Sequence, residues 1–279
     1  RSRSLDKNYI LKNFEDIAQL PDREIDLARA AFLIASSEYP TLNVERELFM
    51  LQRLAGDVSS KLMEEDEPLF TMNTLSEHLF DDLGFKGDSE NYYGPRNSYL
   101  NDVVSRKHGI PITLSLVYSE VGRRLRMPLE GIGMPGHFLV RHREIDDLFV
   151  DPFNGGILLS TEECKQRLKD SVRGSFHWDP KFLQPVTNRE FLARIIRNLK
   201  SIYLRKRDHA RALTMIEFAL ALDPNSTSDR RDRGIIHYHL GNSAEALNDL
   251  QYYLDSSPHG HDTEGVHQLV SELRSFLDD

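Results

Sequence analysis

The spacing of apolar residues divides the chain into three regions. The first, residues 1–83, has the 3.6-residue period of α-helices. Pro21-Asp22 and Pro40-Thr41 interrupt this period and separate consecutive helices. The pattern predicts a long helical hairpin at the start of the chain. Its two apolar faces are Ile25, Leu27, Ala28, Ala31, Phe32 and Ile34 on one helix, and Phe49, Leu51, Leu54 and Val58 on the next.

The second region, residues 84–187, is richer in Gly, Pro, Asn and aromatic residues and contains short strand-like runs. The runs at 134–142 and 148–153 flank a polar turn, a pattern that predicts a β-hairpin in a small antiparallel sheet. A turn centred on Glu144 places His137 opposite Asp151. The two side chains then share one face of the sheet, with Cβ atoms about 5 Å apart.

Two helices are predicted in the same region. Residues 113–125 carry apolar side chains on one side, and Ser115, Ser119 and Gly122 form a stripe of small residues that would let a sheet approach closely. The spacing in 160–163 is that of a capping box, which predicts a further helix start.

The third region, residues 188–279, repeats itself at an offset of 34 residues. This period, an alanine in the second helix and a closing proline are typical of tetratricopeptide repeats. The pattern predicts two helix pairs and a capping helix near 263–277, which would form either a peptide-binding groove or a helical buttress. The matching positions are Asp208 and Asn242, Ala212 and Ala246, Leu213 and Leu247, Ile216 and Leu250, Leu220 and Leu254, and Pro224 and Pro258.

The charge and composition narrow the classes of function. A formal net charge of -9 argues against a general affinity for nucleic acid or anionic membranes. No apolar run is long enough to cross a bilayer and no signal-peptide pattern opens the chain, so a cytoplasmic location is expected. The single cysteine, Cys164, excludes an internal disulfide. The chain begins with Arg1 rather than Met, which leaves open the removal of a targeting segment.

His137 and Asp151 are two of the three groups that a cysteine protease or transglutaminase needs. The third is a thiolate at a helix N-terminus, where the helix dipole lowers its pKa. The helix that starts at Pro111 carries Thr113 and Ser115 in its first turn and no cysteine. Hydroxyls at these positions are more often capping groups than nucleophiles. Cys164 lies in a different helix and is expected to be a small buried residue.

No metal ion or cofactor is predicted. His259-Gly260-His261-Asp262 follows a proline in an exposed connection and lacks partner cysteines, which favours a solvated loop over a metal site. Gly131, Gly133 and Gly136 are interrupted by Pro135 and precede a strand rather than a helix, unlike a phosphate-binding loop.

Several motifs together resemble the SirB-type family of transglutaminase-like proteins with C-terminal tetratricopeptide repeats. The resemblance implies a core related to the papain and transglutaminase fold, preceded by helices and followed by repeats. His137 and Asp151 match the histidine and aspartate of the transglutaminase pattern, whereas the cysteine position falls at Ile112 to Thr113. Gly94 departs from the acidic residue usual in the family. The motifs are Tyr92-Tyr93-Gly94-Pro95-Arg96-Asn97-Ser98-Tyr99-Leu100, Gly109-Ile110-Pro111-Ile112-Thr113-Leu114-Ser115, Pro135-Gly136-His137-Phe138-Leu139-Val140-Arg141, Asp151-Pro152-Phe153-Asn154-Gly155-Gly156 and Asp232-Arg233-Gly234-Ile235-Ile236.

Three hypotheses follow. In the first, which the missing thiol and the repeats favour, the protein binds a peptide, protein or small ligand without catalysis. Its cleft would be lined by His137, Asp151 and three ligand-binding candidates, namely Arg96, Asn97 and Asn154. In the second, His137 acts as a general base, Asp151 orients it, and Thr113, Ser115 or a water attacks an amide or ester. In the third, the His137–Asp151 pair only satisfies two buried polar groups.

Overall fold

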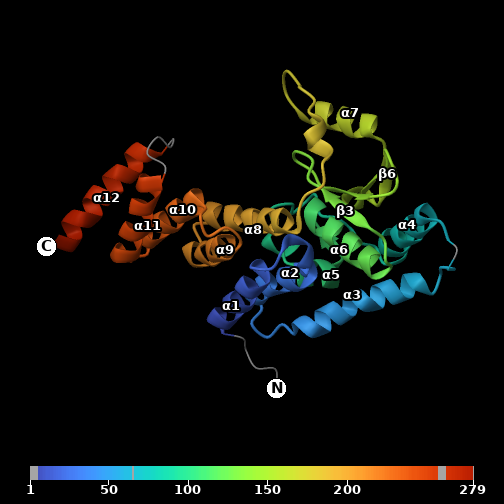
Figure 1. Ribbon diagram of the computed structural model, residues 1–279, viewed down its shortest axis with the longest axis horizontal. Coiled ribbons are helices and arrows are strands. Elements are labelled where there is room, and N and C mark those ends of the chain that lie inside the picture. Colours follow the sequence, from blue (N-terminus) through green and yellow to red (C-terminus); the bar gives the residue numbers. More distant parts are fainter. Residues whose placement is uncertain (1–5, 65, 257–261, 279) are drawn as a thin grey trace. The chain divides into compact units, whose positions relative to one another are not determined.

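The computed structural model describes residues 6–64, 66–256 and 262–278, which form two compact units. The first unit contains Leu20–Ile195 and the chain up to Ile10, and the second contains Leu11–Gln19 and the chain from Ile196. Helices predominate, and the strands form two small sheets (Figure 1). The predicted α+β class is therefore confirmed.

The N-terminal region is helical, but it contains more elements than one hairpin. All residues of α2 except Arg29 are buried, so this helix lies inside the first unit. The amphipathic helix α3 buries Leu51, Ala55 and Val58. The assignment of Phe49 to this apolar face is wrong, because two residues before Leu51 is the opposite side of a helix, and Phe49 is 61% exposed. The elements are α1 (Lys7–Ala18), η1 (Asp22–Glu24), α2 (Leu27–Ser36), α3 (Val44–Ser59), α4 (Pro68–Ser76) and the π-helical segment η2 (Glu77–Asp82).

The main sheet has four antiparallel strands in the order β3-β4-β5-β6. Val140 pairs with Val150, so the hairpin is centred on position 145 and the predicted centre at Glu144 is wrong. The loop is longer at its C-terminal end because Asp147 has a left-handed backbone (φ 52°) and its carboxylate accepts a hydrogen bond from the Thr161 N–H at 2.6 Å. The strands are β3 (Leu129–Ile132), β4 (Leu139–His142), β5 (Phe149–Asp151) and β6 (Ile157–Leu159), with a separate parallel pair β1 (Lys86–Gly87) and β2 (His108–Gly109).

Helix α6 (Pro111–Arg124) packs against β3 and β4, as Figure 1 shows for β3. The small-residue stripe permits this approach, as predicted. A Cβ atom on Gly122 would lie 2.3 Å from a methyl carbon of Leu129, and the Ser115 hydroxyl donates to the Phe138 carbonyl at 3.4 Å. The segments before α6 are η3 (Pro95–Asn97) and α5 (Leu100–Arg106).

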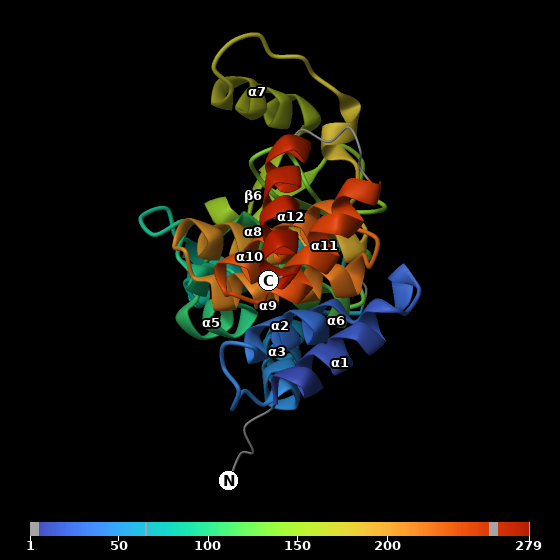
Figure 2. The ribbon, with the colours of Figure 1, turned by 90° about the vertical axis from the view of Figure 1, so that its left-hand side faces the viewer.

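Helix α7 (Thr161–Ser171) begins at the predicted capping box, since Ser160 and Glu163 bond each other's backbone N–H groups. It packs against β6 (Figure 2). Its buried residues Cys164 and Leu168 join an apolar cluster that includes Ile132 and Leu139 of the sheet. The short helices beside it are η4 (Pro152–Asn154) and η5 (Pro180–Leu183).

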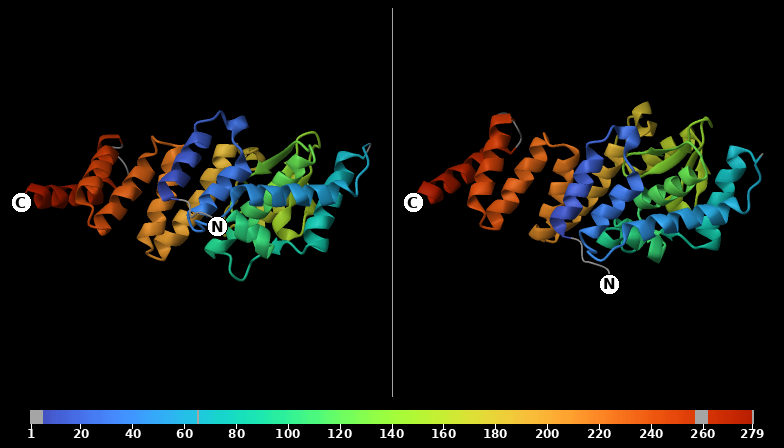
Figure 3. Two further views of the ribbon diagram at one scale, coloured as in Figure 1. Left: turned by 90° about the horizontal axis from the view of Figure 1, so that it is seen from below. Right: turned by 60° about the horizontal axis from the view of Figure 1, so that its bottom comes forward.

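The second unit is built from the predicted repeat helices. Helix α9 packs against α10, α10 against α11, and α11 against α12 (Figure 3). The aligned Ala212 and Ala246 are both fully buried, and a Cβ atom on Gly234 would lie 2.8 Å from Leu250 Cγ. Small residues thus allow close helix packing; Pro258 lies outside the described residues. The helices are α8 (Asn188–Arg205), α9 (His209–Leu222), α10 (Thr227–His239), α11 (Ser243–Ser256) and α12 (Thr263–Asp278).

None of the helices in the described ranges combines the length and the apolar character needed to span a membrane.

Candidate functional site

The structure brings His137 and Asp151 together, although not by the predicted cross-strand pairing. His137 lies in the turn before β4, and Asp151 is the last residue of β5. In the observed register the position facing Asp151 is 139, so His137 is its diagonal neighbour. A shift of two residues keeps a side chain on the same face, and a diagonal neighbour is within reach of an imidazole. Nε2 of His137 lies 2.9 Å from Oδ2 of Asp151.

The Asp151 carboxylate is fully buried and held by three side chains. Besides His137, Oδ2 accepts from Asn154 Nδ2 at 2.7 Å and from Arg167 Nη1 at 3.4 Å, while Oδ1 accepts from the Asn154 N–H at 3.3 Å. Burial by itself raises the pKa of Asp151, but the hydrogen bonds and charge interactions from His137 and Asn154 outweigh it. The net result is a pKa below the usual range, so Asp151 is an ionised hydrogen-bond acceptor at neutral pH.

The ionised Asp151 determines which nitrogen of the neutral imidazole carries the proton. A carboxylate can only accept, so Nε2 of His137 donates and Nδ1 has the free lone pair. Within the described residues Nδ1 has no hydrogen-bond partner, and the His137 side chain is 19% exposed. The ring of Phe153 contacts the imidazole edge-on at a centroid distance of 6.0 Å, and Tyr92 contacts Phe153 at 6.1 Å. Nδ1 can therefore accept a proton from a molecule bound beside this aromatic pair.

The two predicted hydroxyl nucleophiles, Thr113 and Ser115, are not available to this base. Thr113 is fully buried, and its hydroxyl donates to the Asn97 carbonyl at 2.7 Å and accepts from the Ile110 N–H at 3.2 Å. Ser115 is also fully buried and donates to Phe138. In the part of the chain that the structure describes, neither hydroxyl bonds to His137. Both hydroxyls therefore hold α6 against neighbouring segments of the chain.

Cys164 cannot replace the missing thiol. Its side chain is fully buried in the apolar cluster under α7. Burial raises the pKa of this thiol to about 12, so it is protonated at neutral pH. The prediction of a small buried residue agrees with this placement.

Asn97 and Arg96 belong to two hydrogen-bond clusters that are distinct from that of Asp151. The fully buried Asn97 amide donates to Asp88 Oδ2 at 3.0 Å and to the Asn91 carbonyl at 2.8 Å, and accepts from Arg106 at 3.2 Å. No ligand can reach this amide, so its role here is structural. Asn154, by contrast, is at the Asp151 site.

Arg96 is anchored by a buried carboxylate. Its Nε and Nη2 atoms donate to Asp102 Oδ1 at 3.0 and 2.9 Å, and the Tyr39 hydroxyl donates to Oδ2. Desolvation and this bond to Asp102 raise the pKa of Tyr39 to about 12. The Arg96 side chain is 61% exposed, so it keeps a surface for an approaching molecule.

Sequence reasoning missed Arg167 and the ring contact of Phe153. Arg167 is one of several charged residues on α7, and nothing in its spacing connects it with Asp151, which is 16 residues away. Phe153 is part of a recognised motif, but a single sequence does not show which way its ring points. Among the described residues no cluster of three or more His, Cys, Asp or Glu could hold a metal ion. His259 and His261 lie outside those residues.

Comparison with known proteins gives two family matches. The model of the transglutaminase-like superfamily matches residues 45–197, and a tetratricopeptide-repeat model matches residues 199–271. The repeats indicate a role in protein interaction. No solved structure matches the chain.

Relatives match over most of the chain. A UPF0162 protein of Xylella fastidiosa is 38% identical over 272 residues, which is 96% of each chain. Protein SirB1 of Salmonella typhimurium is 26% identical over 85% of this chain and 87% of that protein. F-box only protein 21 of Homo sapiens is 26% identical over 82% of this chain, but the match spans only 36% of that protein.

Proposed function

The chain belongs to the transglutaminase-like superfamily and to the UPF0162 family, and from this premise we propose that it is a non-catalytic, protein-binding member of both. The match to SirB1 confirms the SirB-type resemblance of its motifs. In this proposal the core retains the histidine and aspartate of an ancestral active site, and the repeats supply a second binding surface. The proposed domains are an N-terminal helical region (residues 1–83), a transglutaminase-like core (84–187) and the repeats with their capping helix (188–279). The proposed location is the cytoplasm.

One observation carries the proposal: the helix N-terminus that should hold a nucleophilic thiol holds Thr113, whose hydroxyl is already engaged. An alcohol nucleophile must pass its proton to the base during attack, so it needs to be within about 3 Å of the imidazole. Thr113 instead donates to the Asn97 carbonyl. With Cys164 also buried, the site has a base and an orienting carboxylate but no nucleophilic side chain among the described residues.

The same site supports a second candidate function, hydrolysis by an activated water molecule. Because Nδ1 of His137 has a free lone pair, a water molecule bound there could be activated to hydrolyse an amide or ester. This reaction needs no protein nucleophile. Its activity would depend on His137, whereas the binding proposal does not require that imidazole.

The test compares the intact protein with His137→Gln, whose amide can still donate to Asp151. Both proteins are incubated with fluorogenic amide, ester and thioester substrates, and hydrolysis is followed over hours. We expect no turnover above the buffer rate for either. Turnover by the wild type that is lost in His137→Gln would establish the hydrolase and overturn the binding proposal.

The binding half of the proposal is tested with a photo-crosslinking amino acid at Tyr93, which is 64% exposed beside Tyr92. The matched control carries the same group at Tyr9, which is 56% exposed on α1. A partner protein should crosslink from position 93 and not from 9, and also in the His137→Gln background. Equal labelling from both positions would contradict a binding surface at the site.

A further inference from the structure

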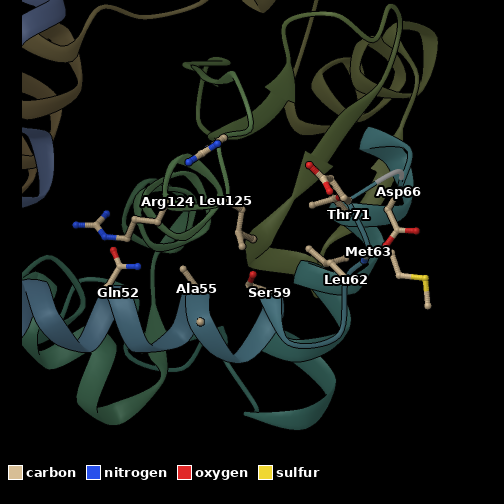
Figure 4. Close-up of a pocket in the computed structure, with 12 residues that line it drawn as sticks. Gln52, Ala55, Ser59, Leu62, Met63, Asp66, Thr71, Arg124 and Leu125 are labelled. Atoms are coloured by element: carbon tan, nitrogen blue, oxygen red, sulfur yellow. Dashed lines mark hydrogen bonds between the residues drawn. The ribbon is translucent and has the colours of Figure 1, made fainter.

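A cavity lies in the first unit at the C-terminal end of α6, apart from the His137 site. It has a volume of about 540 Å³, within the range of ligand-binding pockets. Its walls come from α3, α4, the segment between them and the end of α6 (Figure 4). Thr113 and Arg124 are separated by eleven residues of helix, or about 16 Å. None of the residues of the His137 site lines this cavity.

One end of the cavity is basic. Nη1 of Arg124 is fixed by the Glu120 carboxylate at 2.7 Å and the Glu120 carbonyl at 2.8 Å, so the rest of the guanidinium is held in a defined position. Figure 4 shows the Gln52 amide directed towards Arg124. Arg126 also lines the cavity, and its side chain has no hydrogen bond or ion pair with any described residue.

The backbone at Arg126 is unusual for a charged residue. It has φ 63° just beyond the end of α6, a position that glycine or asparagine commonly fills because other side chains are strained there. Arg126 thus adds to the lining a second guanidinium, two residues after Arg124 and without a partner among the described residues. Two arginines close together in the chain suit a carboxylate, which guanidinium groups bind with paired hydrogen bonds.

The other end of the cavity is acidic. Glu64 and Asp66 line it beside Met63, and the Asp66 carboxylate accepts a hydrogen bond from the Met63 N–H at 2.6 Å. Met63 is 81% exposed, which adds an apolar edge. In Figure 4, α3 runs along the floor from Gln52 near Arg124 to Ser59, and Leu62 lies between Ser59 and Asp66. The seven helical residues from Gln52 to Ser59 span about 10 Å, and Leu62 extends the floor towards the acidic end.

We infer that this cavity docks an extended segment of a partner protein in which an acidic and a basic residue are four positions apart, with an apolar residue midway between them. Successive side chains of an extended chain point to opposite faces, so these three residues share the face that enters the cavity. Four residues of extended chain cover about 13 Å, slightly more than the part of the floor from Gln52 to Ser59. The acidic side chain meets Arg124 and Arg126, the basic one meets Glu64 and Asp66, and the apolar one contacts Ala55 and Leu62. A simple anion suits only one end, and the acidic end disfavours nucleic acid and anionic lipid.

The test uses synthetic peptides as the probe. An array presents Glu-x-x-x-Lys and Lys-x-x-x-Glu peptides in Gly-Ser flanks, with the three middle residues varied and the central one apolar. Gln-x-x-x-Gln peptides are the neutral control. The strongest binder is then labelled with fluorescein and titrated by fluorescence anisotropy. We expect the charged peptides to exceed the neutral control in at least one order.

Three substitutions decide where the peptide binds. Arg126→Glu and Glu64→Lys should each weaken binding about five- to tenfold, because each turns an attraction at the partly exposed site into a repulsion. Arg124 is left intact because it also bonds the buried Glu120 carboxylate, so its loss would disturb the fold as well as the cavity. Arg53→Glu, on the exposed side of α3, should change binding less than twofold.

The proposal is overturned if no charged peptide exceeds the neutral control, or if Arg126→Glu binds as well as the wild type. Equal weakening by Arg53→Glu would also overturn it, since that result would show non-specific attraction. The peptide should bind His137→Gln unchanged, so this outcome is independent of the proposed function of the His137 site.

Discussion

At the scale of single residues, Asp151 connects the stability of the site to pH. It is the one buried carboxylate that holds His137, and its pKa in the folded protein is lowered. A lowered folded pKa means that the ionised form stabilises the fold. This contribution is complete above the unfolded pKa of about 3.9 and is lost as the pH falls through the lower folded value.

We therefore expect Asp151→Asn to reduce the free energy of unfolding by about 2 kcal/mol at pH 7, since His137 and Arg167 lose a charged acceptor. The difference from the wild type should shrink towards pH 3. Urea denaturation of both proteins at the two pH values measures it. A constant difference would show that the ionisation of Asp151 does not stabilise the fold.

Side-chain contacts were predictable from the sequence only where the partners are close in the chain. The His137–Asp151 pair lies on one hairpin, and the two-residue register error left the side chains on the same face. Arg167 and the contact between Thr113 and Asn97 depend on how separate elements pack, which a single sequence does not encode in any local pattern.

At the scale of elements, the repeat helices were predicted best, because both repeats pack in the same way and their residue pattern occurs twice in the sequence. The N-terminal region was predicted less completely. Its period identifies helices, but all residues of α2 except Arg29 are buried, so its pattern does not show which helices surround it. The hairpin centre was missed because Asp147 caps a helix that follows later in the chain.

The packing of the repeat helices makes a specific prediction for Gly234 in α10. A Cβ atom there would meet Leu250 Cγ at 2.8 Å and Asp249 Cβ at 3.2 Å, and valine adds two further carbons. Gly234→Val should destabilise the second unit by about 2 kcal/mol through overpacking. Gly265→Ala in α12 is the control, because its Cβ meets nothing within 4 Å and should add about 0.5 kcal/mol. Urea unfolding followed by circular dichroism compares them, and equal effects would contradict the packing argument.

At the scale of the whole molecule, the division into two compact units predicts two unfolding transitions rather than one. Leu139 and Leu250 are both fully buried, the first in the sheet and the second in the repeat helices. Leu139→Ala and Leu250→Ala each remove three carbons from a packed core and should cost about 3 kcal/mol. In scanning calorimetry each substitution should lower the temperature of one transition and leave the other in place. Since the core site and the repeats would then keep their folds separately, a partner could bind either unit while the other is partly unfolded. A single transition lowered by both substitutions would instead show that the two units fold cooperatively.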